Sequence, residues 1–410
     1  MNKELSIVNA FVVTTFVSIP LIDLGFTDIR FYDFVGFFFV VSFSSYLRKK
    51  IWRNHQLAKL VLIALILLPI NTGLYSSGVF GLGVFTIRLL RLFLFFFAGI
   101  VAVDVYSKHN KLLSLLWLLV ACSLASQGII LLQILGVLPV LWPTKWLYYE
   151  DHWRTGLLSP HHLQPAVYAI TSIFFYGLYD KLYFSINKKS LTSFWKIALI
   201  VSSFIWVYIC FFNESRTGMV LSFFLLAFYI GISPKNIFIS IVLSSIVVFS
   251  NGWLFSTLVD FFSQGIEEEA TRYEVQGSLS SQRVYIRNEI IERFLSFHDI
   301  RYYTGYGFNN YPGPGAAAHN NYLQILLEFG LIGLFLVVSY LYKLLKRSFS
   351  FIRNDIYLFS GVYVAFMCVA MFFNEIIYPT YIGFATPALV IISFEIARSL
   401  MKTYRAPISS

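Results

Sequence analysis

Long apolar runs follow one another along almost the whole chain, with short polar segments between them. Most are close to the length of about 20 residues that a helix needs to cross a bilayer. The pattern predicts twelve membrane-spanning helices, near residues 5–22, 31–47, 58–76, 81–103, 112–136, 160–180, 192–212, 216–233, 235–256, 320–342, 356–373 and 379–400. We therefore predict an all-α polytopic membrane protein. Residues 1–410 are predicted to form a single integral membrane domain, with residues 257–319 as one large loop with short helices between spans nine and ten.

The composition excludes most soluble classes. Hydrophobic residues make up 58% of the chain and charged residues only 13%, whereas soluble domains carry about 25% charged residues. The three cysteines lie inside apolar runs without the spacing of a zinc site or a disulfide framework. The sequence also lacks a P-loop, a dinucleotide-binding motif, an HExxH motif and an Asp-x-Asp pair. We therefore expect no metal and no other cofactor.

The basic residues predict the orientation in the membrane. If the N-terminus is cytoplasmic, 20 Lys and Arg residues fall on the cytoplasmic side, nine on the other side and two within a span. Cytoplasmic loops are enriched in these residues, so both termini are predicted to be cytoplasmic and the long loop external. The net charge of +10 thus reflects topology, and no nucleic-acid partner is expected.

The external basic residues are eight Arg and one Lys, whereas the cytoplasmic set is 14 Lys and six Arg. Topology requires only positive charge, but the planar guanidinium of Arg binds phosphate with two parallel hydrogen bonds. This difference favours a phosphate ligand on the external side. The alternative is that external loops avoid Lys in a small sample.

Two predicted spans begin at the external face with residues that suit such chemistry. Arg216 follows Ser215 at the start of one span; the alternative is an interfacial Arg, with Ser215 as a helix cap. His319 lies in the first turn of another, where the positive helix end favours the neutral imidazole that accepts a proton. A histidine that only caps the helix is the alternative there.

Further arginines lie in the long loop and inside a span. Residues 280–294 predict an amphipathic helix with Ile286, Ile290, Ile291 and Phe294 on one face. Arg283 and Arg287 are one turn apart on it and can face the same anion; a salt-bridged, solvated face is the alternative.

Arg88 and Arg91 share a face of the span at 81–103, and burying them in lipid is costly. We expect them to contact a lipid-linked phosphate, with interhelical hydrogen bonds as the alternative. Asp23, Asp28 and Asp33, in or beside the first external loop, are expected to be solvated.

These motifs together resemble the O-antigen polymerase and O-antigen ligase superfamily. The resemblance covers about residues 205–340 and rests on the order and common external side of the motifs. They are Ser215-Arg216-Thr217-Gly218, the Arg283 helix, Gly305-Tyr306-Gly307, His319-Asn320-Asn321-Tyr322-Leu323 and Glu328-Phe329-Gly330-Leu331-Ile332-Gly333. Arg154, in Trp153-Arg154-Thr155-Gly156, is similar to a less specific family feature.

The resemblance implies a bacterial inner-membrane glycosyltransferase with a GT-C-like fold. Such an enzyme transfers glycans from undecaprenyl diphosphate at the periplasmic face without metal or nucleotide. It implies that Arg216 and Arg283 hold the diphosphate and that His319 activates the acceptor hydroxyl. The residues expected to bind diphosphate or glycan are Arg88, Arg91, Arg154, Arg287, Asn320 and Tyr322, of which Arg88 and Arg91 rest on the span pattern alone. The expected partners are a lipid-linked oligosaccharide donor and acceptor, membrane lipids and a chain-length regulator.

Two activities occur in this superfamily. A polymerase moves the growing glycan to the next lipid-linked repeat unit, whereas a ligase moves the finished glycan to lipid A–core. Ala317 stands where ligases often show the first His of a His-x-His-Asn pattern, and the single His319-Asn320 favours a polymerase. A glycan-lipid flippase or other transporter is a third alternative, but the two halves of the chain are unlike each other, which is unusual for transporters.

Overall fold

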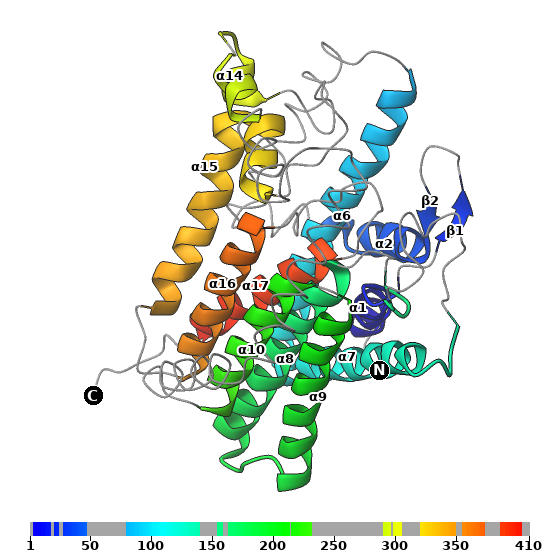
Figure 1. Cartoon of the computed structure of the whole chain (residues 1–410), viewed down its shortest axis with the longest axis vertical. Helices are drawn as coiled ribbons and strands as arrows, with labels where there is room; N and C mark the ends of the chain where they lie inside the picture. The colour runs from blue at the N-terminus through cyan, green and yellow to red at the C-terminus, as the bar shows by residue number, and fades with distance from the viewer. Residues whose placement is uncertain are drawn as a thin grey trace, which may run out of the picture.

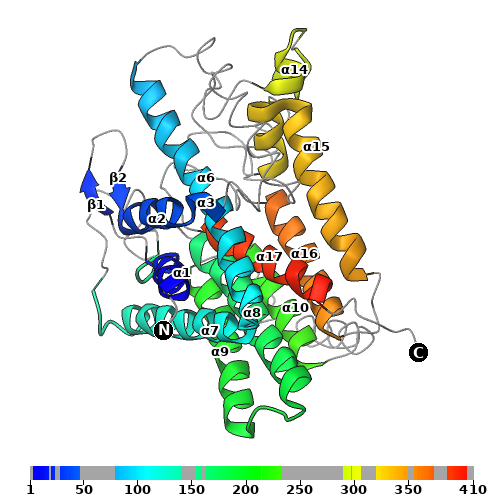
Figure 2. The same ribbon diagram turned by 180° about the vertical axis from the view of Figure 1, so that it is seen from behind.

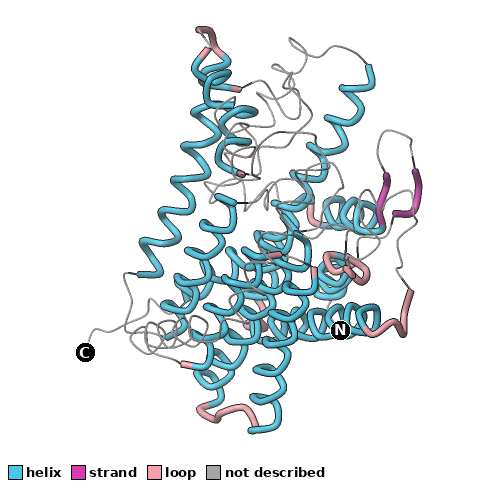
Figure 3. Tube along the Cα trace, in the orientation of Figure 1, coloured by secondary structure: helices cyan, strands magenta, loops and turns pink. Residues whose placement is uncertain are grey.

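A computed structural model describes residues 3–17, 20–23, 28–46, 79–139, 154–158, 163–213, 215–231, 290–296, 298–305, 320–349, 355–373 and 386–403. Regular structure in these ranges is helical except for one two-stranded antiparallel hairpin, formed by β1 (Pro20–Asp23) and β2 (Asp28–Arg30). Figure 3 shows this dominance of helices. The hairpin is the one departure from the predicted all-α class within the described residues.

Figure 1 shows how the described helices are arranged, and all but α14 (Arg301–Thr304) lie in the predicted apolar runs. They are α1 (Lys3–Thr14), α2 (Phe31–Ser42), α3 (Ser44–Tyr46), α6 (Val79–Lys108), α7 (Leu112–Ile134), α8 (Leu163–Asn187), α9 (Ser193–Phe212), α10 (Arg216–Ile230), α14 (Arg301–Thr304), α15 (Asn321–Phe349), α16 (Asp355–Phe373) and α17 (Thr386–Thr403). Ten of the twelve predicted ranges contain a described helix over at least part of their length. The predicted spans at 58–76 and 235–256 lie outside the described residues.

Three described helices, α7, α9 and α15, are long and apolar enough to cross a membrane. α9 also has the outer face of a lipid-exposed helix. Its exposed side chains at three- and four-residue intervals are Phe194, Ile197, Val201, Phe204, Tyr208 and Phe211. An aqueous surface would carry polar groups at such positions. These helices indicate a multi-pass membrane protein, whereas the full count of twelve spans stays a prediction.

The first predicted span ends earlier than expected. α1 stops at Thr14, where the hydroxyls of Thr14 and Thr15 donate to the carbonyls of Phe11 and Val12, both at 2.7 Å. Pro20, which has no backbone N–H to continue a helix, then begins β1. The predicted range 5–22 was therefore wrong after Thr14, where local side-chain bonds to the backbone compete with the helical hydrogen bonds.

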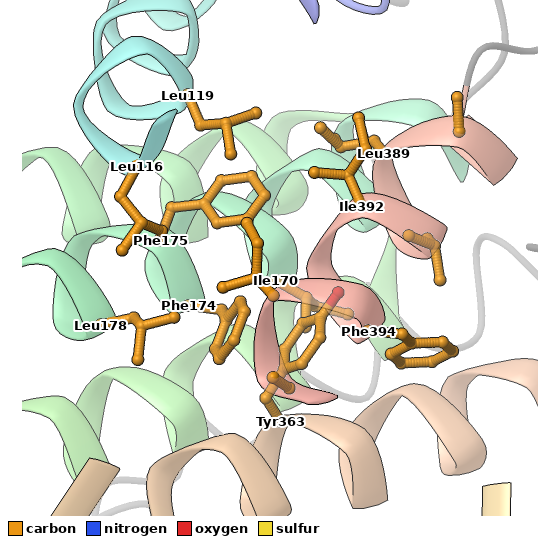
Figure 4. Packing of buried hydrophobic residues seen from close by; sticks show 14 of the residues in the cluster. Leu116, Leu119, Ile170, Phe174, Phe175, Leu178, Tyr363, Leu389, Ile392 and Phe394 are labelled. Atoms are coloured by element: carbon orange, nitrogen blue, oxygen red, sulfur yellow. The ribbon is translucent and has the colours of Figure 1, made fainter. Parts of the chain in front are cut away.

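The core is built around α8. Phe174 of α8 stacks on Tyr363 of α16, with ring centroids 4.0 Å apart and an interplanar angle of 13°. Figure 4 shows this pair and the neighbouring buried residues Leu116, Leu119, Ile170, Phe175, Leu178, Leu389, Ile392 and Phe394. These come from α7, α8 and α17. α8 therefore ties together helices that lie far apart in the sequence.

A polar network joins the C-terminal halves of α6, α15 and α17. Glu395 of α17 pairs with Arg398 and accepts a hydrogen bond from Tyr340 of α15 at 3.2 Å. Ser107 of α6 bonds to Ser399 of α17 at 2.7 Å, and α6 lies alongside α17, as Figure 2 shows. The C-terminal halves of these three helices therefore lie together in the bundle; that they point to the cytoplasmic side stays a prediction from the basic residues.

α15 is broken by a close backbone contact. Gly330 has φ 64° and ψ −164° within it, and Gly305, directly after α14, has φ 73° and ψ −175°. A Cβ on Gly305 would overlap the carbonyl of Glu328, and one on Gly330 would overlap that of Tyr303. The predicted uninterrupted span at 320–342 is therefore kinked, because α14 packs against its backbone at Gly330.

Candidate functional site

The segment that carries Arg154 is held at the turn between α9 and α10. The backbone N–H of Arg154 donates to Oδ1 of Asn213 at 2.8 Å, and Nδ2 of Asn213 donates back to the Arg154 carbonyl at 3.1 Å. Nδ2 also donates to the carbonyl of Ile209 at 2.9 Å. Asn213 is completely buried and lies three residues before Arg216. Its amide therefore fixes the Arg154 backbone close to the start of α10.

The same segment is held from α7. Oε1 of Gln133 accepts a hydrogen bond from the Gly156 N–H at 2.8 Å, and its Nε2 donates to the Pro139 carbonyl at 3.0 Å. Gly156 adopts a φ of 63°, which favours glycine. The structure therefore brings together two regions that the sequence singled out separately, those of Arg154 and Arg216. No role was predicted for Gln133 and Asn213. The sequence feature that could have identified them is an amide side chain near the C-terminal end of an apolar helix.

Arg216 is the first residue of α10, as predicted, but Ser215 at the N-cap makes no side-chain capping bond. The start of α10 is instead fixed by Gly218, where an added Cβ would lie 2.8 Å from Cα of Ala166 on α8. The two backbones thus cross closely beside Arg216. The side chain of Arg216 lies outside what the structure describes, as does that of Arg88 within α6.

The first turn of α15 is capped by Asn320. Its Oδ1 accepts hydrogen bonds from the backbone N–H groups of Tyr322 and Leu323 at 2.9 and 3.1 Å, the ordinary role of an N-cap asparagine. The hydroxyl of Tyr322 donates to the Cys368 carbonyl of α16 at 3.1 Å. Both predicted substrate contacts therefore also hold the helix start in place, and their contact with substrate stays a prediction.

Arg91 is paired with Asp33. The guanidinium donates from Nε to Oδ1 at 2.9 Å and from a terminal nitrogen to Oδ2 at 2.6 Å, and it lies over the Tyr32 ring at 5.8 Å. Oδ2 of Asp33 also accepts from the Arg30 N–H at 2.8 Å. The expectation that Asp33 is solvated was wrong, because Asp33 lies in the first turn of α2 and faces α6. The Arg91–Asp33 pair joins α6 to α2, which is the interhelical hydrogen bonding that the sequence left as the alternative. A contact between Arg91 and a phosphate stays a prediction.

A buried polar row runs along the start of α15. Asn321, Gln324 and Glu328 have exposures of 0%, 2% and 1%, and the Gln324 amide nitrogen donates to the Glu328 carboxylate. Two of these residues, Asn321 and Glu328, lie within the motifs above, but no role was predicted for them. The sequence feature that could have identified the row is its spacing of three and four residues, which places polar residues on one face of an apolar helix. Polar residues at such positions in membrane proteins are often functional.

The O-antigen ligase family model matches residues 200–338. Residues 200–338, about a third of the chain, are therefore similar to the O-antigen ligase family. No curated protein matches the chain significantly. The matched range includes Arg216, Arg283, Arg287, His319, Asn320 and Tyr322, and the Asn321–Glu328 row. Arg88, Arg91 and Arg154 lie before it, so their assignment as substrate contacts has no support from this superfamily match.

Part of the predicted superfamily site lies beyond the described residues. Arg283, Arg287 and His319 are outside them. Of the predicted loop helix, residues 290–295 are helical, and Ile290 and Phe294 are buried beside Leu327. Ile291 is 40% exposed, so it does not belong to the buried face as expected. Within the described part, the structure places no group of three His, Cys, Asp or Glu residues where they could hold a metal ion.

Proposed function

We propose that this protein is a metal-independent O-antigen polymerase of the bacterial inner membrane. It transfers the growing glycan from undecaprenyl diphosphate to the non-reducing-end hydroxyl of the next lipid-linked repeat unit at the periplasmic face. The match at residues 200–338 carries the proposal, because this one range contains Arg216, Arg283 and His319. The lone His319-Asn320, with Ala317 before it, favours the polymerase. A chain-length regulator is the protein partner that we propose.

The chemistry follows from an activated donor. The bond between the anomeric carbon and the diphosphate breaks, and Arg216 and Arg283 neutralise the departing anion. His319 takes the proton from the acceptor hydroxyl, whose oxygen attacks opposite the leaving group and inverts the anomeric centre. The hydrogen bonds that hold Arg154 beside the start of α10 support its place among the residues that bind the diphosphate.

Replacing Arg216 with Lys is expected to lower turnover about a hundredfold. The charge is kept, but the two parallel hydrogen bonds of the guanidinium to a diphosphate are lost. Purified protein in detergent should be compared for glycosidic bond formation from lipid-linked repeats at equal protein concentration. Arg347→Lys, at an exposed position near the far end of α15, is the matched control and should keep the wild-type rate. Wild-type turnover in the Arg216 variant would remove Arg216 from this role.

An O-antigen ligase is the second candidate, because the family model that matches residues 200–338 carries that description. It would use the same donor but deliver the glycan to lipid A–core. The two activities leave different products when the protein is absent, so deletion of its gene separates them.

The deletion is expected to abolish the lipopolysaccharide ladder on a gel and to leave core with a single repeat unit. Bare core, with long glycan accumulating on the lipid carrier, would instead indicate the ligase. An unchanged pattern would argue against a non-redundant role in O-antigen and direct the assay to capsule or exopolysaccharide. Transport alone would form no glycosidic bond in the purified assay.

A further inference from the structure

The polar row at the start of α15 contains atoms without partners. Asn321 is completely buried, and neither its Nδ2 nor its Oδ1 has a hydrogen-bond partner in the described part of the chain. The same holds for Oε1 of Gln324, a residue that is 2% exposed. Buried polar atoms in native proteins nearly always have a partner. Two neighbouring amides with three unpaired atoms therefore indicate a place that a polar ligand occupies.

The contacts of α15 show which way this row faces. Tyr322 is bonded to α16 through the Cys368 carbonyl, and Leu327 packs against Ile290 and Phe294. Residues three, four and seven positions apart share one helical face. Asn321, Gln324 and Glu328 therefore form one face between these two contacts, and this face begins two residues after His319.

The unpaired atoms specify the chemistry of the ligand. One is a donor, Nδ2 of Asn321, and two are acceptors, Oδ1 of Asn321 and Oε1 of Gln324. The Glu328 carboxylate beside them accepts a hydrogen bond from Nε2 of Gln324, the other polar atom of that side chain. A phosphate offers only acceptors and would meet these oxygens unfavourably, whereas sugar hydroxyls both donate and accept.

We infer that Asn321 and Gln324 bind hydroxyl groups of the acceptor sugar and position it against His319. This inference rests on the proposed glycosyl transfer, since His319 is proposed to take the acceptor's proton. The arginines are proposed to hold the donor diphosphate, so the neutral amides complement them. Glu328 is a positioning residue that orients Gln324 through its amide nitrogen.

Stability separates this role from a purely structural one. An amide that holds the fold together has protein partners, and its removal destabilises the protein. An amide without partners in the ligand-free protein can be replaced by an apolar group of similar size with little loss, or with a gain. Asn321→Leu and Gln324→Met are therefore expected to unfold at or above the wild-type Tm. Gln127→Met is the matched control, because the buried Gln127 amide donates to the Ser202 carbonyl, and it should lower the Tm.

The experiment uses purified full-length protein in detergent. The donor is undecaprenyl-diphosphate glycan at fixed concentration, and the acceptor is a short-chain lipid diphosphate analogue of the repeat unit at varied concentration. Asn321→Leu and Gln324→Met should each raise the acceptor KM about tenfold or more and leave the donor KM unchanged. Gln127→Met should leave both KM values unchanged.

The outcomes of this assay are distinguishable. A wild-type protein that forms no glycosidic bond would overturn the proposed function itself. An active wild type together with unchanged acceptor KM in both variants would overturn only the inference about Asn321 and Gln324. A fall in Tm in both variants, with both KM values at the wild-type level, would assign the amides to the core. A raised acceptor KM at an undiminished Tm supports the inference.

Discussion

Replacing Gly330 with Ala should lower the free energy of unfolding by about 3 to 5 kcal/mol. The backbone of Gly330, at φ 64° and ψ −164°, lies in a region that only glycine adopts readily. The added Cβ would also overlap the Tyr303 carbonyl and come within 2.6 Å of the Thr304 nitrogen. Backbone atoms cannot swing aside as a flexible side chain does, so either α14 or the kink of α15 must move.

Two other glycines separate these effects. Gly136 has a φ of 72° with nothing within 4 Å of an added Cβ, so Gly136→Ala should show only the conformational cost, about 1 kcal/mol. Gly128, inside α7 and equally open, should become more stable by up to about 1 kcal/mol as alanine, because alanine favours the helix. Thermal unfolding in detergent measures all three. Equal losses of unfolding free energy in the Gly330 and Gly136 variants would argue against a destabilising overlap with the α14 backbone.

Replacing Arg91 with Met should destabilise the protein by about 3 kcal/mol. The change leaves Asp33 without the two hydrogen bonds that compensate its charge next to a buried face. The estimate is at the lower end for buried pairs because the Asp33 side chain keeps 18% exposure. The double variant Asp33→Leu/Arg91→Met should recover part of the loss, since neither charge of this pair then remains without the other. Thermal unfolding of Arg91→Met, Asp33→Leu and the double variant gives the coupling free energy between the two side chains.

An exposed pair is the control for this measurement. Arg301 donates from Nε to both carboxylate oxygens of Asp299, and these hydrogen bonds hold the pKa of Asp299 below its ordinary value. A lowered carboxyl pKa stabilises the fold above the ordinary carboxyl pKa, and this stabilisation is lost as the pH falls through the lowered value. At neutral pH Arg301→Met should nevertheless change the Tm little, because exposed pairs contribute little. If Arg91→Met keeps the Tm but loses activity, the predicted phosphate contact is the better explanation.

The sequence alone determined where most helices lie. The predicted spans at 192–212, 216–233, 320–342 and 356–373 begin within a residue of α9, α10, α15 and α16. Within a bilayer every backbone N–H and C=O must be paired inside the segment. A long apolar run is therefore almost obliged to form a helix, and the start of these four helices can be read locally. The helix-opening position of Arg216 follows from the same pattern, whereas its role in binding diphosphate stays a proposal.

Tertiary structure decided the pairings. The sequence marked Asp33, Arg91, Arg154 and Gly330 as separate features, but only the fold shows that Asp33 meets Arg91 and that Asn213 holds Arg154. It alone shows why Gly305 and Gly330 must lack a side chain. Such contacts join residues that are far apart in the chain, and hydrophobic periodicity contains no information about which two helices meet. Burial then selects the partners, because a charge or amide that leaves water must be paired where the packing places it.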